Sequence, residues 1–330
     1  MKTEVHESLD AIGAEAWEAL RAGSGLAAPF MSWTWQREWV AVFGAGRRLE
    51  VRAVTDRDGR LLAVLPLAEM APGRLVLVGG ADVSDYLDVL ARRGHETEAW
   101  SALLDGRAAD DAVWELHAVP GASATVTALP GLAAAAGLTA TATLEERCPV
   151  LALPATWDAY LASLTKKHRH ELTRKIRRFE REIPDGRIAW ETTAAGIGRR
   201  LDEFLALHRA SREGKAKFMD ERMARFFRGA IVALAGQGSA RLAFLDTPAG
   251  PIASFVTLEW GTTVGLYNSG FAPVHAALAP GLVLLAGVIR DALERGCRRF
   301  DFLRGEERYK YDFGPTAEPV YLVTVGGPAA

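Results

Sequence analysis

Two stretches of the chain repeat one order of hydrophobic and polar positions. Each begins with two alternating segments around a polar turn, a pattern typical of an antiparallel β-hairpin. A further strand pattern follows, then a helical pattern, then a closing strand. In the first stretch these segments are residues 49–55 and 61–68, 74–78, 96–104 and 113–119, and in the second they are 240–245 and 252–260, 263–268, 282–295 and 300–303.

This repetition predicts a duplicated α/β fold. Each lobe is expected to hold a mixed, mostly antiparallel sheet flanked by helices. We expect the boundary near residues 145–155, and we divide the chain into an N-terminal domain of residues 1–147 and a C-terminal domain of residues 148–330. The length of 330 residues suits two domains, since it is about twice that of a typical domain.

Apolar residues at intervals of three or four positions predict the helices. In the C-terminal half they start near Thr156, and a break is expected near Thr165. The stripes are Trp35, Trp39, Val42 and Phe43; Leu161, Leu164, His168, Leu172, Ile176, Phe179 and Ile183; Leu201, Phe204, Leu205 and His208; Phe226, Phe227, Ile231 and Leu234; and Leu282, Leu285, Ile289 and Leu293.

Charge and composition narrow the class of protein. A net charge of −2 argues against a globally basic DNA-binding protein. Cys148 and Cys297 have neither a metal-binding nor a redox spacing, so we expect no metal site and a reducing compartment. The first residues lack a signal-peptide core, and the longest apolar run, residues 278–289, is shorter than the roughly 18 residues of a membrane helix. A soluble cytoplasmic protein without a membrane partner is therefore expected.

Residues 299–310 carry the densest candidate chemistry. Asp301 lies between Phe300 and Phe302 on an otherwise apolar strand, and Gly305 then breaks the chain into a charged turn. A carboxylate on a buried strand followed by close polar groups is typical of a substrate pocket at a strand end, although a structural ion-pair cluster has the same composition. The polar residues of the turn are Arg304, Glu306, Glu307, Arg308, Tyr309 and Lys310.

The helix expected from Lys166 onward is strongly basic. Its apolar stripe leaves the cations on the opposite face, where they could hold the phosphates of a nucleotide cofactor or an RNA backbone. A solvated helix face is the alternative, and the absence of interleaved aromatic residues disfavours RNA. The cations are Lys166, Lys167, Arg169, Arg174, Lys175, Arg177, Arg178 and Arg181, which lie against Glu171 and Glu180.

Two further features lie on the strands and the helix of the C-terminal half. The helix start at Pro280, Gly281 and Leu282 offers backbone N–H groups and a positive dipole end, which suit an anionic diphosphate, although Pro-Gly also simply starts helices. Glu259 and Tyr267 near two strand ends are candidates for a base and an acid. The alternatives are a solvent-facing hairpin residue for Glu259 and an aromatic residue at the edge of the core for Tyr267.

Two other segments contain candidate substrate-binding residues. Residues 79–88 follow a strand and combine two glycines with three aspartates, so Asp85 and Tyr86 could contact an amine-bearing substrate, whereas a plain turn is the alternative. His208 lies near a helix end and could reach a pocket, although a helix C-terminus favours cations in any case.

With these residues in view, the C-terminal half resembles the GNAT-like acetyltransferases of the cellulose-biosynthesis (CelD/BcsL) type, which are related to the FemAB-type peptidyl transferases. The resemblance rests on an ordered run of elements rather than on any single one. The first half, through residues 84–88, is similar to the family's N-terminal region. The elements in the second half are the basic helix, residues 207–209, 226–227, 241–258, 267–270, 280–285, 292–296 and 300–306, and Tyr309 with Lys310.

The resemblance implies two GNAT-like lobes with a cleft between them. It also implies direct attack by an amine or hydroxyl acceptor on acetyl-CoA or another acyl-CoA in a ternary complex. Backbone N–H groups of residues 254–260 would stabilise the developing oxyanion. Asp301 or Glu259 would take the acceptor proton, and Tyr267 or Tyr309 would protonate the leaving thiolate.

The same hypothesis assigns the remaining candidates to the two substrates. No metal is expected in the reaction. The donor-binding residues would be Asn268, Pro280, Gly281, Leu282, Arg174 and Arg178. A small-molecule, carbohydrate or peptide acceptor would be framed by Asp85, Tyr86, His208, Arg304, Glu306 and Lys310.

One departure from the wider superfamily leaves a second kind of acyl donor as an alternative to acyl-CoA. Residues 275–281 contain a single glycine, whereas many acetyltransferases hold the CoA diphosphate with an Arg/Gln-x-x-Gly-x-Gly/Ala loop. The FemAB-type relatives also lack that loop and take an aminoacyl group from tRNA. An aminoacyl-tRNA-dependent peptidyl transferase is therefore the alternative enzyme, and a non-catalytic binding protein on the same fold is a third hypothesis.

Overall fold

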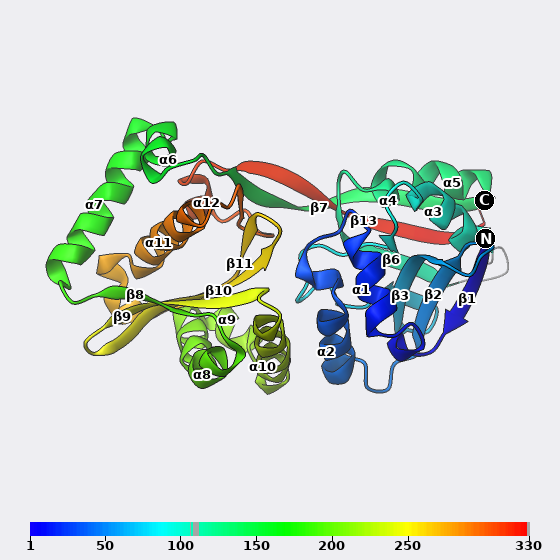
Figure 1. The fold of residues 1–330 in the computed structure, drawn as a ribbon, viewed down its shortest axis with the longest axis horizontal. Helices are drawn as coiled ribbons and strands as arrows, with labels where there is room; N and C mark the ends of the chain where they lie inside the picture. The colour runs from blue at the N-terminus through cyan, green and yellow to red at the C-terminus, as the bar shows by residue number, and fades with distance from the viewer. Residues whose placement is uncertain (106, 108–111, 329–330) are drawn as a thin grey trace. The chain divides into compact units, whose positions relative to one another are not determined.

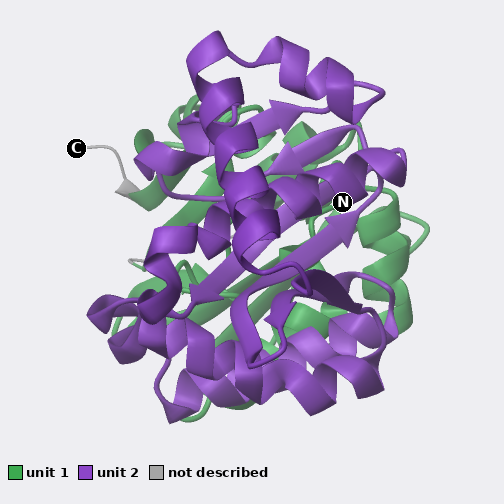
Figure 2. Cartoon of the chain, turned by 90° about the vertical axis from the view of Figure 1, so that its left-hand side faces the viewer, with its two compact units in different colours: residues 1–147, 318–330 green, residues 148–317 purple. Residues whose placement is uncertain are grey.

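The chain forms two compact units (Figure 2). The computed structural model describes residues 1–105, 107 and 112–328. Unit 1 comprises Met1–Arg147 and the chain from Glu318 onward, and unit 2 comprises Cys148–Ala317. The boundary after Arg147 falls inside strand β7 (Leu138–Ala152). The sequence-based ranges 1–147 and 148–330 differ from these units beyond residue 317, and as a division into domains they stay a prediction.

Unit 1 is built on strands that pair in the order β1-β2-β3-β4-β6-β13, with β5 paired to β3. β4 and β6 are parallel, and the other pairs are antiparallel. Its elements are β1 (Lys2–His6), α1 (Ala14–Ala22), α2 (Trp33–Phe43), β2 (Leu49–Thr55), β3 (Leu61–Ala71), β4 (Arg74–Leu77), β5 (Leu90–Ala91), α3 (Glu96–Asp105), β6 (Val113–Pro120), α4 (Ala124–Thr127), α5 (Leu129–Ala135) and β13 (Thr316–Pro328), with short 3-10 helices at Leu9–Ala11 and Pro29–Met31.

Unit 2 is built on strands in the order β8-β9-β10-β11-β12, and the end of β7 pairs with β12. α11 covers one face of the strands, and α8 and α10 cover the other (Figure 1). Its elements are α6 (Trp157–Ser163), α7 (Lys166–Glu182), β8 (Arg187–Glu191), α8 (Ala194–Ser211), α9 (Glu213–Phe218), α10 (Glu221–Gly236), β9 (Ala240–Thr247), β10 (Gly250–Trp260), β11 (Thr263–Phe271), the 3-10 helix η3 (Pro273–Leu278), α11 (Pro280–Glu294), β12 (Arg299–Asp301) and α12 (Arg308–Tyr311).

The predicted α/β fold with a repeated order of elements is confirmed. In unit 1 the parallel pair β4 and β6 is joined through α3, and in unit 2 the parallel pair β11 and β12 is joined through α11. Parallel neighbours need such a crossover, whereas the antiparallel pairs β2–β3 and β9–β10 are joined by short turns. The hydrophobic patterns predicted these elements because each has one buried face.

Polar residues at the helix starts explain the breaks between helices in unit 2. Thr165, Thr193 and Asp220 each accept a hydrogen bond from a backbone N–H in the first turn of α7, α8 and α10. Each such cap stabilises a helix by about 1 kcal/mol. The expected break near Thr165 is therefore confirmed as the start of α7.

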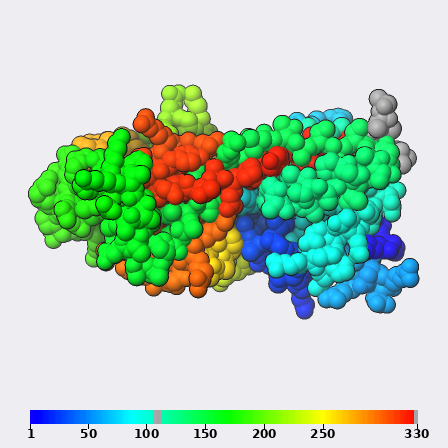
Figure 3. Space-filling model, turned by 90° about the horizontal axis from the view of Figure 1, so that it is seen from above, coloured from blue at the N-terminus to red at the C-terminus, as the bar shows by residue number. Residues whose placement is uncertain are grey.

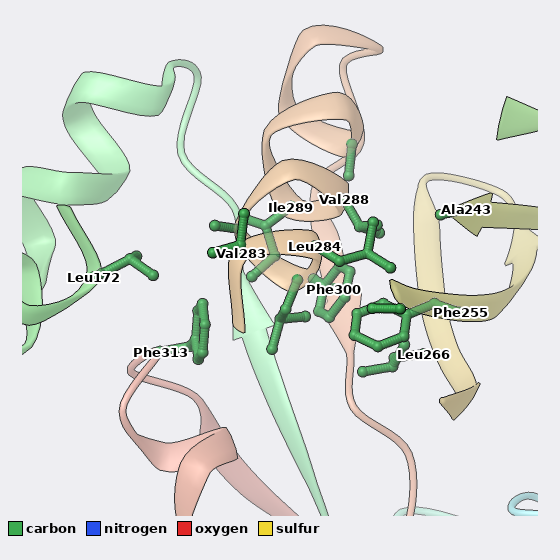
Figure 4. Packing of buried hydrophobic residues seen from close by; sticks show 14 of the residues in the cluster. Leu172, Ala243, Phe255, Leu266, Val283, Leu284, Val288, Ile289, Phe300 and Phe313 are labelled. Atoms are coloured by element: carbon green, nitrogen blue, oxygen red, sulfur yellow. The ribbon is translucent and has the colours of Figure 1, made fainter. Parts of the chain in front are cut away.

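The core of unit 2 joins α11 to the strands. Phe300 of β12 is fully buried beside Leu284 of α11 and Phe255 of β10 (Figure 4). Burying one such side chain contributes roughly 1.5–3 kcal/mol. Because side chains alternate along a strand, Asp301 points to the face opposite Phe300.

The strand predicted over residues 300–303 ends earlier than expected. β12 stops at Asp301, and Leu303 has a φ of 55°, in the left-handed region that a leucine rarely adopts. The Asp301 Oδ1 atom accepts a hydrogen bond from the Leu303 N–H at 2.8 Å. The carboxylate therefore stabilises the turn that ends the strand.

No helix among residues 1–105, 107 and 112–328 combines the length and the apolar character that crossing a membrane requires.

Candidate functional site

The parallel strands β11 and β12 diverge and leave an opening in unit 2. Their pairing ends where Gly265 lies opposite Asp301, and β11 then continues to Phe271 paired with β10 but not with β12. A cavity of about 260 Å³ lies along this part of β11. It is lined by Arg212, Lys215, Phe255, Ser269, Phe271, Ala276, Ala279, Pro280, Gly281, Leu282, Glu307 and Tyr309.

A β-bulge distorts β11 where it passes the end of β12. Leu266 pairs with Thr257 and Asn268 pairs with Val256, so Tyr267 is an extra residue on β11. Bulges bend a strand and often lie beside active sites. The bulge therefore helps to separate the end of β11 from its neighbour.

The start of α11 supplies one wall of the cavity. Ala279 adopts a left-handed conformation with φ 51°, and no side chain caps the helix. Pro280 has no N–H, and the N–H groups of Leu282 and Val283 both donate to the Ala279 carbonyl. Among the described residues the Gly281 N–H has no acceptor, so it is the free donor of this first turn. The sequence-based candidates Pro280, Gly281 and Leu282 therefore lie together at the cavity.

Lys215 is a cavity residue that sequence reasoning missed. Its ammonium group donates hydrogen bonds to the Ser269 carbonyl oxygen and, at 3.0 Å, to the Ser269 Oγ. Burial, followed by repulsion from Arg212, lowers the pKa of Lys215 to about 8, although Glu307 opposes the shift. The sequence held only a weak signal for Lys215, which lies on α9, directly after the helix that carries His208.

Glu307 and Tyr309 bring a carboxylate and a phenol to the same cavity. Burial raises the pKa of Glu307, but the hydrogen bond from Lys310 and the charges of Lys310 and Arg212 together lower the pKa below its usual value. Burial, followed by the charge of Glu307, raises the pKa of the Tyr309 hydroxyl. At neutral pH the cavity thus presents an ionised carboxylate and a protonated phenol.

Lys310 fixes the loop that carries these groups. Its side chain is buried, and its ammonium group donates to the carbonyl oxygens of Arg304 and Gly305 at 2.8 and 2.9 Å and pairs with Glu307 at 2.9 Å. Glu306 is exposed and accepts a hydrogen bond from the Tyr311 hydroxyl at 2.7 Å. Arg304, Glu306 and Lys310 do not line the cavity, and their predicted contacts with an acceptor stay a prediction.

The other predicted catalytic residues lie away from the cavity lining. Asp301 is 1% exposed and holds the turn after β12. The Tyr267 ring stacks on Phe227 with centroids 5.5 Å apart. Both carboxylate oxygens of Glu259 are engaged by Arg295, at 2.7 and 2.8 Å. Of the four candidates, Tyr309 is the one that lines the cavity, and catalytic roles for the other three stay predictions.

The predicted donor-binding residues beyond α11 also lie outside the lining. Asn268 accepts a hydrogen bond from the Ser269 N–H at 3.1 Å through its own side chain. Arg174 pairs with Glu171 at 2.8 Å, and Arg178 pairs with Glu182 at 2.8 Å, both along α7. The green atoms in Figure 3, the colour of the residue numbers that include α7, lie at the molecular surface.

Two predicted acceptor residues belong to unit 1. Asp85 and Tyr86 follow β4 and are partly buried, and the Tyr86 ring lies 6.3 Å from the ring of Phe30. Their role toward an acceptor stays a prediction.

His208 is buried against β11 rather than exposed in the cavity. It is 2% exposed, and its Nδ1 donates to the Ser269 carbonyl oxygen at 2.9 Å. Its Nε2 is buried and has no hydrogen-bond partner. Burial, followed by the charge of Lys215, lowers the pKa of His208 to about 4 from 6.5. The imidazole is therefore neutral at pH 7 and positions Ser269.

We expect the neutral state of His208 to make stability depend on pH. The unfolded chain takes up this proton near pH 6.5 and the folded chain near pH 4, so stability is full above pH 6.5 and falls as the pH drops between these values. Between pH 7 and pH 5 the loss from this group is about 2 kcal/mol. Urea unfolding at both pH values should show a larger loss for the wild type than for His208→Asn, which keeps a donor and does not titrate. Equal losses would contradict the assignment.

The described residues include no cluster of three or more His, Cys, Asp or Glu side chains that could hold a metal ion.

Residues 166–311 match a family model described as an acetyltransferase (GNAT) domain. The GNAT part of the sequence resemblance is therefore confirmed, and this domain lies within unit 2. The match does not identify the cellulose-biosynthesis type. No curated protein matches the chain in sequence.

Solved structures match nearly the whole chain in fold. FemX has a TM-score of 0.67 at 12% identity, over 98% of this chain and 97% of its own. The C-terminal domain of an Agrobacterium fabrum protein named as a lysylphosphatidylglycerol synthetase has a TM-score of 0.62 at 12% identity, over 96% and 92%. L-PGS from Bacillus licheniformis has a TM-score of 0.60 at 13% identity, over 94% and 90%. At such low identities the likeness shows the fold alone.

Proposed function

We propose that this chain is an acyltransferase that binds an acyl-CoA in the cavity of unit 2 and transfers the acyl group to an amine or hydroxyl acceptor by direct attack. The observation that carries the proposal is the cavity beside the end of β11 that extends beyond β12, in the part of the chain that matches a GNAT domain. The finer assignment to the cellulose-biosynthesis type rests on the sequence resemblance, and the cytoplasm is the proposed location.

The residues of the cavity fit an acyl-CoA in two respects. Phe255, Phe271 and Leu282 give it apolar walls, which suit an acyl chain and its thioester. The free Gly281 N–H at the positive end of α11, together with the cations Arg212 and Lys215, suits the anionic part of the donor. We propose that these residues hold the donor, and that η3 takes the place of a glycine-rich diphosphate loop.

Acyl-CoA, when bound, supplies an activated carbonyl and a thiolate leaving group. Tyr309 keeps its hydroxyl proton at neutral pH because its pKa is raised, so we assign it as the proton donor to the leaving sulfur. Glu307 stays ionised because its pKa is lowered. A carboxylate of this kind holds an ammonium group better than it removes a proton, so we assign Glu307 to binding an amine acceptor as its ammonium, which loses one proton to solvent before the neutral nitrogen attacks.

We expect acetyl-CoA, a longer acyl-CoA or free CoA to stabilise the full chain against heat. A ligand at a hundredfold over its Kd adds about 2.7 kcal/mol to the free energy of unfolding. The melting temperature measured against ligand concentration tests this. Ala276→Trp places a bulky side chain at the cavity and should reduce the shift, whereas Ala277→Trp, at an exposed neighbour that does not line it, should not. No shift with any CoA contradicts the proposal.

The alternative donor is an aminoacyl-tRNA, with a FemAB-like peptidyl transferase as the enzyme. Two observations favour it: the FemX likeness across nearly the whole chain and the exposed cations of α7, which include Arg177 and Arg181. It predicts tRNA binding that weakens steeply with salt and is lost when Arg177 and Arg181 are both changed to glutamate. Such binding without any CoA effect would replace acyl-CoA as the donor.

A further inference from the structure

Lys215 is held at the cavity in an unusual way for a lysine. It is partly buried on the short helix α9, and Ser269 offers its ammonium group two acceptors, the carbonyl oxygen and the Oγ. A neutral amine has two hydrogens and one lone pair. Both hydrogens can therefore be bound by Ser269, which leaves the lone pair free beside the apolar cavity wall.

We propose that Lys215 is a self-acylation site, at which the chain transfers an acyl group from a bound acyl-CoA to its own ε-amine. The inference rests on the proposed function, because the cavity that Lys215 lines is the one assigned to the donor. It adds a covalent modification at Lys215, one of the residues proposed to hold the donor.

The step balances without a further reactant. The Lys215 ammonium first loses one proton to solvent. The neutral nitrogen then attacks the thioester carbonyl carbon, an N–C bond forms and the C–S bond breaks. The second proton of the nitrogen passes to the leaving thiolate. The products are an Nε-acyl-lysine and free CoA thiol, and one proton is released overall.

The other lysines near this site are less suited to the reaction. The Lys310 ammonium is occupied by Glu307 and by the carbonyl oxygens of Arg304 and Gly305. Lys217 lies on the same helix as Lys215, but its side chain is 75% exposed and pairs with Glu213 at 2.7 Å. Lys217 therefore serves as the matched control.

The charges around Lys215 predict how the rate depends on pH. Arg212 before α9 and Lys310 on α12 repel its ammonium form, Glu307 stabilises it, and the neighbouring His208 on α8 is neutral at pH 7. With burial as the leading cause, the pKa of Lys215 is about 8. Acylation of Lys215 should rise between pH 6 and pH 8 and then level off, whereas acylation of an exposed lysine keeps rising about tenfold per pH unit up to its pKa near 10.4.

The experiment incubates the full wild-type chain with acetyl-CoA and follows the intact mass and the modified peptide by mass spectrometry. We expect one acetyl group per chain at Lys215, suppressed at least tenfold by excess free CoA, with a rate that levels off above pH 8. Lys215→Arg should lose the adduct, and Lys217→Arg should keep it.

The outcomes separate this inference from the proposed function. If acetyl-CoA raises the melting temperature but no adduct forms at Lys215, self-acylation is wrong and the acyltransferase proposal stands. The same holds if acetyl groups spread over exposed lysines such as Lys166, Lys167 and Lys217 and free CoA does not suppress them. If no CoA compound changes the melting temperature, the proposed function itself fails.

Discussion

Replacing Gly270 with alanine should lower the free energy of unfolding by about 3 kcal/mol, because the new methyl group overpacks a tight contact. A Cβ at this position would lie 2.4 Å from the His208 nitrogen and 2.6 Å from the Leu207 carbonyl carbon. Both atoms belong to the backbone of α8, so no side chain can rotate away. α8 would have to move away from β11, and this movement would weaken the hydrogen bond between His208 and Ser269.

Urea unfolding of the wild type and Gly270→Ala measures this effect. Gly198→Ala is the matched control, since Gly198 lies on α8 with nothing within 4 Å of its added Cβ. In a helix this control should be neutral or stabilising by about 0.5–1 kcal/mol. If Gly270→Ala were as stable as the control, the close approach of α8 to β11 would be wrong.

Replacing Lys310 with methionine should also cost about 3 kcal/mol, because it breaks a buried ion pair and removes charged hydrogen bonds. Methionine keeps the length of the side chain but leaves the carbonyl oxygens of Arg304 and Gly305 and the carboxylate of Glu307 without their partner. The loss should appear in urea unfolding and should be accompanied by weaker binding at the cavity.

Lys217→Met provides the comparison, because its side chain is largely exposed and such surface changes usually stay within about 0.5 kcal/mol. A similarly small effect for Lys310→Met would mean that the loop before α12 is held by other contacts, and that Lys310 is free to bind an acceptor as the sequence suggested.

The sequence predicted the fold well where a pattern has one buried face. The paired strands β2–β3 and β9–β10 and the helix α11 appear close to their expected bounds, because alternation and a three-to-four spacing follow directly from burial. The end of β12 was not predicted, because Leu303 adopts a left-handed conformation that is rare for leucine. The hydrogen bond from its N–H to the Asp301 side chain stabilises this conformation.

The candidate site was predicted in part. The helix start at Gly281 and the phenol of Tyr309 come together at the cavity, because both follow the ends of neighbouring strands. Lys215 could not be predicted in this way, because it lies on α9, which is distant in sequence from Gly281 and Tyr309. Its low pKa comes mainly from burial, which the sequence does not show. The ion pairs of Glu259 could not be predicted either, because its charge partners Arg241 and Arg295 are distant in sequence, and its catalytic role stays a prediction.

Hydrogen exchange of the full chain with and without saturating acetyl-CoA tests most directly whether the cavity of unit 2 binds the donor. We predict slower exchange in residues 269–282 and 304–311, which include the free Gly281 N–H and the loop of Glu307 and Tyr309. Unchanged exchange in both segments, with protection elsewhere or nowhere, would contradict the account.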